Sequence, residues 1–203
     1  MKKKAGIFAV VLLMIGLTVS GCGAAKHVSS GSSPDAASKA LSSAQTAGAE
    51  QRAYALFSDK NSRNENAGKL LPLLPEIDWA EYEKVSGGRA VDLLQWVSSL
   101  KTDSPEDISL ILNSTKNLDG AYAEQYSDLV GNLFISHQAN FIKALAQLPE
   151  EKRSEVDGYV SNYCSSLADE NQVVSDTKLL LSQTSPAGNE RSAISELLNA
   201  MKK

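Results

Sequence analysis

Hydrophobic residues from about residue 50 to the C-terminus recur every three or four positions, in stretches separated by short polar segments. A helix repeats every 3.6 residues, so this spacing places the apolar side chains on one face. No alternating run typical of a strand extends beyond a few positions, and most glycines fall between the helical stretches. The pattern therefore predicts an all-α fold.

Helix start signals support this interpretation. Residues 78–81, Asp-Trp-Ala-Glu, have the spacing of a capping box, and residues 104–107, Ser-Pro-Glu-Asp, combine a capping serine with a proline in the first turn. Ser136 can cap the next helix, and Pro149 precedes two glutamates that open another. Residues 59–68 are strongly polar and predict a loop.

The middle of the chain also shows a repeat of about 33 residues, the length range of stacked helical units. The units cover about 87–116, 120–148 and 153–184, and a further helix over 190–202 closes the array. Helical hairpins bury their apolar faces by stacking on neighbours, so the pattern predicts a short α-solenoid-like array of antiparallel hairpins, with an irregular helical bundle as the alternative. The aligned positions are Ala90, Ala123 and Val156; Leu93, Tyr126 and Tyr159; Val97, Val130 and Tyr163; Ile108, Phe141 and Val174; Ile111, Ala144 and Thr177; and Leu112, Leu145 and Lys178, of which Lys178 breaks the series.

Three small residues, Ser98, Gly131 and Cys164, share one position of this register. Small residues are expected where a neighbouring helix approaches closely. The units have the length of tetratricopeptide and ankyrin repeats but carry neither family's signature residues. They are similar to HEAT-like hairpins only in general form.

The N-terminus has a different pattern. Three lysines at positions 2–4 precede an uncharged apolar run over residues 7–19, which is short for a permanent membrane span. Small residues then lead directly to a cysteine in the sequence Val-Ser-Gly-Cys, ending at Cys22. This order resembles the signal peptide and lipobox of bacterial lipoproteins. An uncleaved signal anchor and a chance cysteine are the alternatives.

The resemblance implies that residues 1–21 are removed and that Cys22 becomes the first mature residue, carrying acyl chains such as palmitate. Two or more acyl chains give stable membrane anchoring. The expected location is the cell membrane, on the exported side. Residues 22–45 are rich in Ala, Ser and Gly and predict a flexible tether, and residues 46–203 form the helical domain.

Net charge limits the partners. The chain has 20 Lys and Arg against 24 Asp and Glu. Removing residues 1–21 takes away three lysines and no acid, which leaves 17 basic against 24 acidic side chains and a formal charge of −7. An acidic chain is a poor partner for nucleic acid and adsorbs weakly to anionic lipid. The acyl chains, and not a basic patch, are therefore expected to hold the protein at the membrane.

Few residues suggest catalysis or metal binding. With Cys22 acylated, Cys164 has no second cysteine for an intramolecular disulfide, and His27 and His137 are too few and too far apart for a zinc site. We expect no cofactor, no metal and no enzymatic activity. A Cys164/His137 dyad is disfavoured because the repeat register gives Cys164 a small-residue position and His137 a helix start.

Aromatic side chains offer the remaining candidate contacts. Tyr126, Tyr159 and Tyr163 occupy register positions that Leu or Val fills elsewhere, so they are expected in the core. Trp79 and Tyr122 lie near helix starts, where partial exposure would let them contact a ligand. Two functions remain open: a membrane-anchored interaction module for another envelope or extracellular protein, and a lipoprotein that binds a small molecule or glycan.

Overall fold

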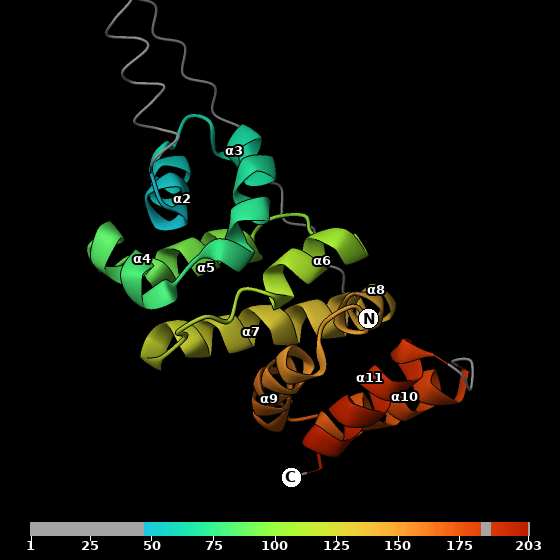
Figure 1. Cartoon of the computed structure of the whole chain (residues 1–203). Coiled ribbons are helices and arrows are strands. Elements are labelled where there is room, and N and C mark those ends of the chain that lie inside the picture. Colours follow the sequence, from blue (N-terminus) through green and yellow to red (C-terminus); the bar gives the residue numbers. More distant parts are fainter. Residues whose placement is uncertain (1–46, 184–187, 203) are drawn as a thin grey trace, which may run out of the picture.

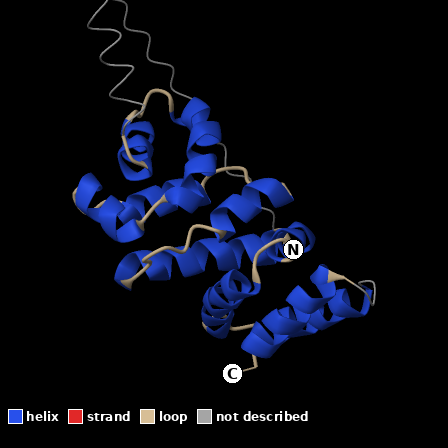
Figure 2. Cartoon of the chain, viewed as in Figure 1, coloured by secondary structure: helices blue, strands red, loops and turns tan. Residues whose placement is uncertain are grey.

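The computed structural model describes residues 47–183 and 188–202, and this part of the chain is helical with no strand (Figure 2). The all-α prediction is confirmed. The predicted signal peptide, Cys22 and the tether lie outside the described residues. The helices are α2 (Ala49–Ser58), α3 (Arg63–Leu70), the 3-10 helix η1 (Leu71–Glu76), α4 (Trp79–Ser86), α5 (Ala90–Ser98), α6 (Pro105–Leu112), α7 (Gly120–Ser136), α8 (Gln138–Leu145), α9 (Glu150–Ser165), α10 (Glu170–Gln183) and α11 (Asn189–Ala200).

The helices from α5 onward pack in two neighbouring rows (Figure 1). In one row α5 contacts α7 and α7 contacts α9; in the other α6 contacts α8 and α8 contacts α11. Helices α2, α3, η1 and α4 contact one another at the N-terminal end, where η1 also packs on α6 and α4 on α5. This packing is consistent with both predicted architectures, the helical array and the irregular helical bundle.

The third predicted unit departs from the repeat. Helix α10 is the expected second helix of the segment 153–184, and Thr177 is its one buried residue among those described. Lys178 is exposed, whereas Leu112 and Leu145, at the same register position in the first two units, are buried. Helix α11 takes the place after α8 in the second row, and α10 packs against α11 and α9. The buried residues of α11 are Ala193, Ile194, Leu197 and Leu198.

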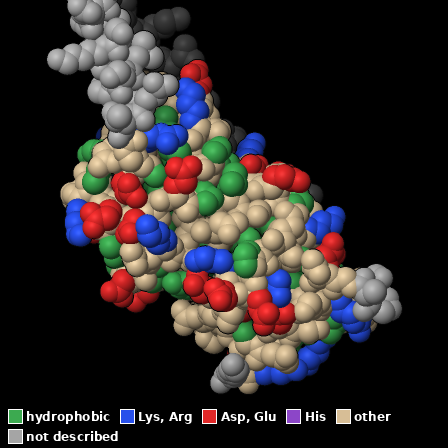
Figure 3. Space-filling model, in the orientation of Figure 1, with side chains coloured by type: hydrophobic (Ala, Val, Ile, Leu, Met, Phe, Trp, Pro, Cys, Tyr) green, Lys and Arg blue, Asp and Glu red, His purple; other side chains and the backbone are tan. Residues whose placement is uncertain are grey.

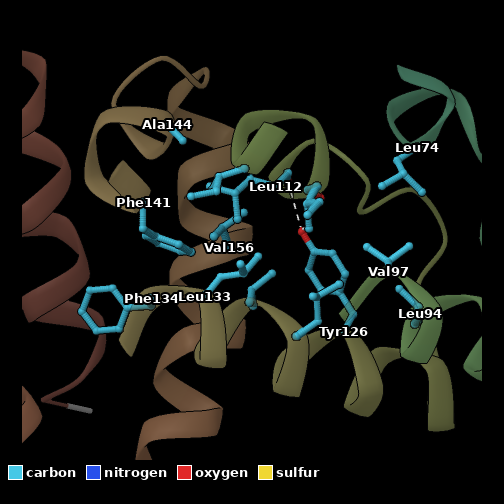
Figure 4. Close-up of a cluster of buried hydrophobic side chains, with 14 of the residues drawn as sticks. Leu74, Leu94, Val97, Leu112, Tyr126, Leu133, Phe134, Phe141, Ala144 and Val156 are labelled. Carbon is cyan, nitrogen blue, oxygen red and sulfur yellow. Dashed lines mark hydrogen bonds between the residues drawn. The ribbon is translucent and has the colours of Figure 1, made fainter. Parts of the chain in front are cut away.

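A buried tyrosine joins the two rows. Tyr126 of α7 is fully buried, and its hydroxyl donates to the carbonyl oxygens of Ile111 at 3.1 Å and Leu112 at 3.2 Å (Figure 4). The ring of Tyr159 from α9 meets Tyr126 edge to face, with 5.0 Å between centroids. The predicted core position of Tyr126 is confirmed, whereas Tyr159 and Tyr163 are partly buried at the edge of the core.

Three predicted helix starts are confirmed. The Asp78 carboxylate accepts from the Glu81 amide at 3.3 Å, the Ser104 hydroxyl accepts from the Asp107 amide at 3.1 Å, and α9 begins directly after Pro149. The backbone amide of Asp78 is bound by a carboxylate from α2, not by Glu81 of the capping box.

Two local predictions are wrong. Ser136 ends α7 and does not cap α8, which begins after His137 with no side-chain cap. Most of the predicted loop over residues 59–68 belongs to α3, because the buried Asn66 amide donates to the Leu56 carbonyl at 3.1 Å and ties this polar segment to α2.

The small-residue position has different roles in the three units. At Gly131 the neighbouring helix does approach closely, because an added Cβ would lie 2.2 Å from the Tyr163 ring of α9. Cys164 is fully buried. Ser98 is exposed and its hydroxyl donates to the Leu94 carbonyl at 3.0 Å. The expectation of close packing therefore holds at Gly131 and is wrong at Ser98.

Candidate functional site

Trp79 is completely buried, so the partial exposure on which its possible ligand contact rested is wrong. Its indole nitrogen donates to the carbonyl oxygen of Ser114 at 2.9 Å and to the Ser114 hydroxyl at 3.1 Å. The Trp79 amide also donates to the Lys116 carbonyl at 3.1 Å. The loop after α6 thus covers the start of α4, and Trp79 serves as a core residue with a satisfied polar tip.

Tyr122 lies on the first turn of α7 and is partly buried against the core, in agreement with its predicted partial exposure. Neither Tyr122 nor Trp79 lines the surface hollows described below. The structure does not bring these two aromatic residues into a common groove, and a ligand contact at Tyr122 stays a prediction.

Cys164 and His137 occupy separate environments. Cys164 is buried on α9, and this burial, with a smaller contribution from Glu170, raises the pKa of the thiol to about 11. A thiol with such a pKa is almost entirely protonated at neutral pH and is a weak nucleophile. His137 lies between α7 and α8 and lines a hollow of about 410 Å³ that Cys164 does not reach.

Acidic and basic side chains are interspersed on the face shown in Figure 3. In the described part of the chain a surface hollow of about 920 Å³ lies between α6, α8 and the start of α11. Gln183 and Gly188 are also among its lining residues. The hollow beside His137 combines leucines with polar side chains.

A third hollow, between α9 and α11, has the most distinctive chemistry. Its volume is about 490 Å³, within the range of small-molecule sites. Its lining contains three carboxylates and no lysine or arginine. We call it the acidic hollow; it is lined by Glu150, Ser154, Asp157, Gly158, Ser161, Glu196, Asn199 and Ala200.

Asp157 is the unusual member of the acidic hollow. It is only 3% exposed, and its buried Oδ1 has no hydrogen-bond partner. Buried polar atoms without a partner are rare because losing water without replacing its hydrogen bonds is costly. Burial is the main cause that raises the Asp157 pKa from 3.8 to about 7; Glu196 raises it further, and Arg153 opposes the shift.

The neighbouring charges are paired with each other. The Arg153 guanidinium donates to both carboxylate oxygens of Glu196, at 2.7 and 3.3 Å, and to the Leu148 carbonyl at 2.9 Å. These hydrogen bonds lower the Glu196 pKa and raise that of Arg153. Because Arg153 is engaged in this way, Asp157 has no direct cationic partner of its own in the described contacts.

Asp157 was not predicted from the sequence as a functional residue. The one available signal is an acid directly after Val156 in a helix whose buried positions also include Val160 and Cys164. An acid at the edge of an apolar stripe is usually solvated, so the pattern does not distinguish a buried carboxylate from an exposed one.

Searches against models of known families, curated proteins and solved structures found no match to this chain. Within the described residues, no group of three or more His, Cys, Asp or Glu side chains could hold a metal ion. None of the helices described is both long and apolar enough to cross a membrane.

Proposed function

We propose that this chain is an exported lipoprotein, anchored through Cys22, whose stacked helices act as an interaction module for another envelope or extracellular protein. The observation that carries the anchor is the order of lysines, apolar run and Val-Ser-Gly-Cys before a polar, acidic chain. The acyl chains supply the membrane affinity that a chain with more acids than bases lacks.

The helical array supports the interaction role. Stacked hairpins present an extended surface made from successive helices, which is how helical repeat proteins bind their partners. The two aromatic candidates for ligand contact form no common stacking surface, since Trp79 is fully buried and Tyr122 is partly buried against the core. The hollow beside His137 and the acidic hollow are both open to the surface.

The anchor is tested by replacing Cys22 with alanine in a bacterium that processes lipoproteins. We expect the variant to lose incorporation of a palmitate analogue and to keep residues 1–21, because the thiol that accepts the lipid is gone. Cys164→Ala is the matched control and should be labelled and cleaved normally, since Cys164 is buried in the folded domain. Labelling of Cys22→Ala, or loss of labelling in the control, would refute the assignment.

The interaction role is tested by lysine cross-linking on intact cells, followed by mass spectrometry. We expect reproducible links from one face of the array to one envelope protein, and we expect them to weaken in the unanchored Cys22→Ala chain. Links confined to the chain itself, or scattered over many proteins without a preferred face, would contradict an interaction module. Exposed lysines on different helices report the face: Lys69, Lys84, Lys143 and Lys178.

Small-molecule capture is the second candidate function. One observation favours it: the acidic hollow contains a buried carboxylate oxygen without a hydrogen-bond partner.

A further inference from the structure

We propose that the acidic hollow binds an organic amine through its ammonium group, with Asp157 as the principal acceptor. This inference rests on the second candidate function and does not depend on the lipid anchor. Its basis is the combination of a hollow of about 490 Å³, a lining with three carboxylates and no basic side chain, and the unpartnered Oδ1 of Asp157.

Asp157 Oδ1 has no donor among the described residues, so it is able to accept a hydrogen bond from a ligand. A carboxylate oxygen accepts hydrogen bonds, and a charged donor forms stronger ones than a neutral donor. The nearest cation, Arg153, already forms a two-pronged pair with Glu196. A ligand that brings its own positive charge would satisfy Asp157 without breaking that pair.

The spread of the acceptors favours an amine over a metal ion. The described residues hold no set of three or more acidic, cysteine or histidine side chains able to ligate a metal. An ammonium group instead carries three donors that can reach separate acceptors. Besides Asp157, the hollow offers the carboxylate of Glu150, the hydroxyl of Ser154 and the amide of Asn199.

A polyamine fits this distribution of charge. Its ammonium groups are separated by methylene chains, so one group can pair with Asp157 while another approaches Glu150 at the same hollow. Helices α9 and α11 provide both walls, and the Arg153–Glu196 pair joins them. The ligand therefore enters a site whose walls are already held together.

Binding is expected to depend on pH. The charged groups that shift the Asp157 pKa are Arg153, on the same helix, which lowers it, and Glu196, on α11, which raises it. Glu150 also lines the hollow. Since the Asp157 pKa is raised to about 7, its carboxyl is mostly protonated at pH 6 and mostly ionised at pH 8. Only the ionised form attracts an ammonium group, so affinity should rise about tenfold between these pH values, in step with the ionised fraction.

The test is calorimetric titration of residues 22–203 with spermidine at pH 8 and pH 6. We expect wild type to bind at pH 8, to bind about tenfold more weakly at pH 6, and to release protons on binding at pH 6 and 7. Asp157→Asn should weaken binding at pH 8 at least tenfold. Glu124→Gln, which removes one exposed acid from α7, is the matched control and should bind as wild type does.

The outcomes separate the ligand class from the function. If Asp157→Asn binds spermidine as tightly as wild type, the site is not at Asp157 and the inference is overturned. If wild type binds an uncharged trisaccharide but not spermidine, ligand capture stands and the amine is wrong. If wild type binds neither probe, both the amine and the small-molecule function are contradicted.

Discussion

Replacing Gly131 with alanine is expected to lower the free energy of unfolding by about 2 kcal/mol, although alanine is the better helix former. The new Cβ would lie 2.2 Å from Cδ1 and Cγ of Tyr163 and 2.6 Å from its Cβ. The Tyr163 ring would have to leave the α7–α9 contact, and its hydroxyl would lose the 2.8 Å hydrogen bond to Asn132. Denaturant unfolding followed by circular dichroism measures the loss.

Gly158 provides a matched control for this change. It also lies inside a helix, α9, but an added Cβ there meets nothing within 4 Å. Gly158→Ala should raise the free energy of unfolding by about 0.5 to 1 kcal/mol through helix propensity alone. In a double variant, Tyr163→Ala should remove most of the penalty at Gly131. Equal effects of the two glycine replacements would disprove the close helix approach.

Asp157→Asn is expected to become more stable than wild type as pH rises from 4 to 8. A carboxyl whose pKa moves from 3.8 to about 7 on folding binds more protons in the folded state, which costs roughly 4 kcal/mol of stability once pH exceeds the folded value. The contribution of Asp157 protonation to the free energy of unfolding is fully present below pH 4 and is lost as pH rises through about 7. Asparagine cannot ionise, so the variant avoids this loss.

The measurement is the difference in free energy of unfolding between Asp157→Asn and wild type at several pH values. Taking the difference removes the shared contribution of carboxylates with lowered pKa that do not act on Asp157, such as Glu155. Glu124→Gln should run parallel to wild type across the range. Parallel curves for Asp157→Asn as well would mean that the Asp157 carboxyl ionises normally in the folded protein.

Local sequence was sufficient for the helical class and for three of the four helix starts that it indicated. Asp78 and Ser104 were identified as caps because capping requires only a side-chain oxygen and an amide three residues later. Gly131 was assigned to a close helix approach because the repeat register places small residues at that position. In each case the interacting groups are near in the chain or share a periodic position.

Partners far apart in the chain could not be predicted in this way. The burial of Trp79 depends on Ser114, and α3 forms where a loop was expected because the Asn66 amide reaches the Leu56 carbonyl of α2. The place of α11 beside α8 also breaks the repeat. Periodicity identifies the apolar face of a helix, but it does not say which helix will cover that face.

The acidic hollow also shows the difference between features that follow from local sequence and features that depend on contacts between distant segments. The sequence by itself determined that the chain has a lipobox-like start, more acidic than basic side chains and amphipathic helices, since these depend on composition, residue order and spacing. Only the tertiary structure decided that Asp157 is buried beside Glu196, a residue brought to it by the packing of α11 on α9. A carboxyl's pKa depends on the water and charges around it, and those are set by contacts between distant segments.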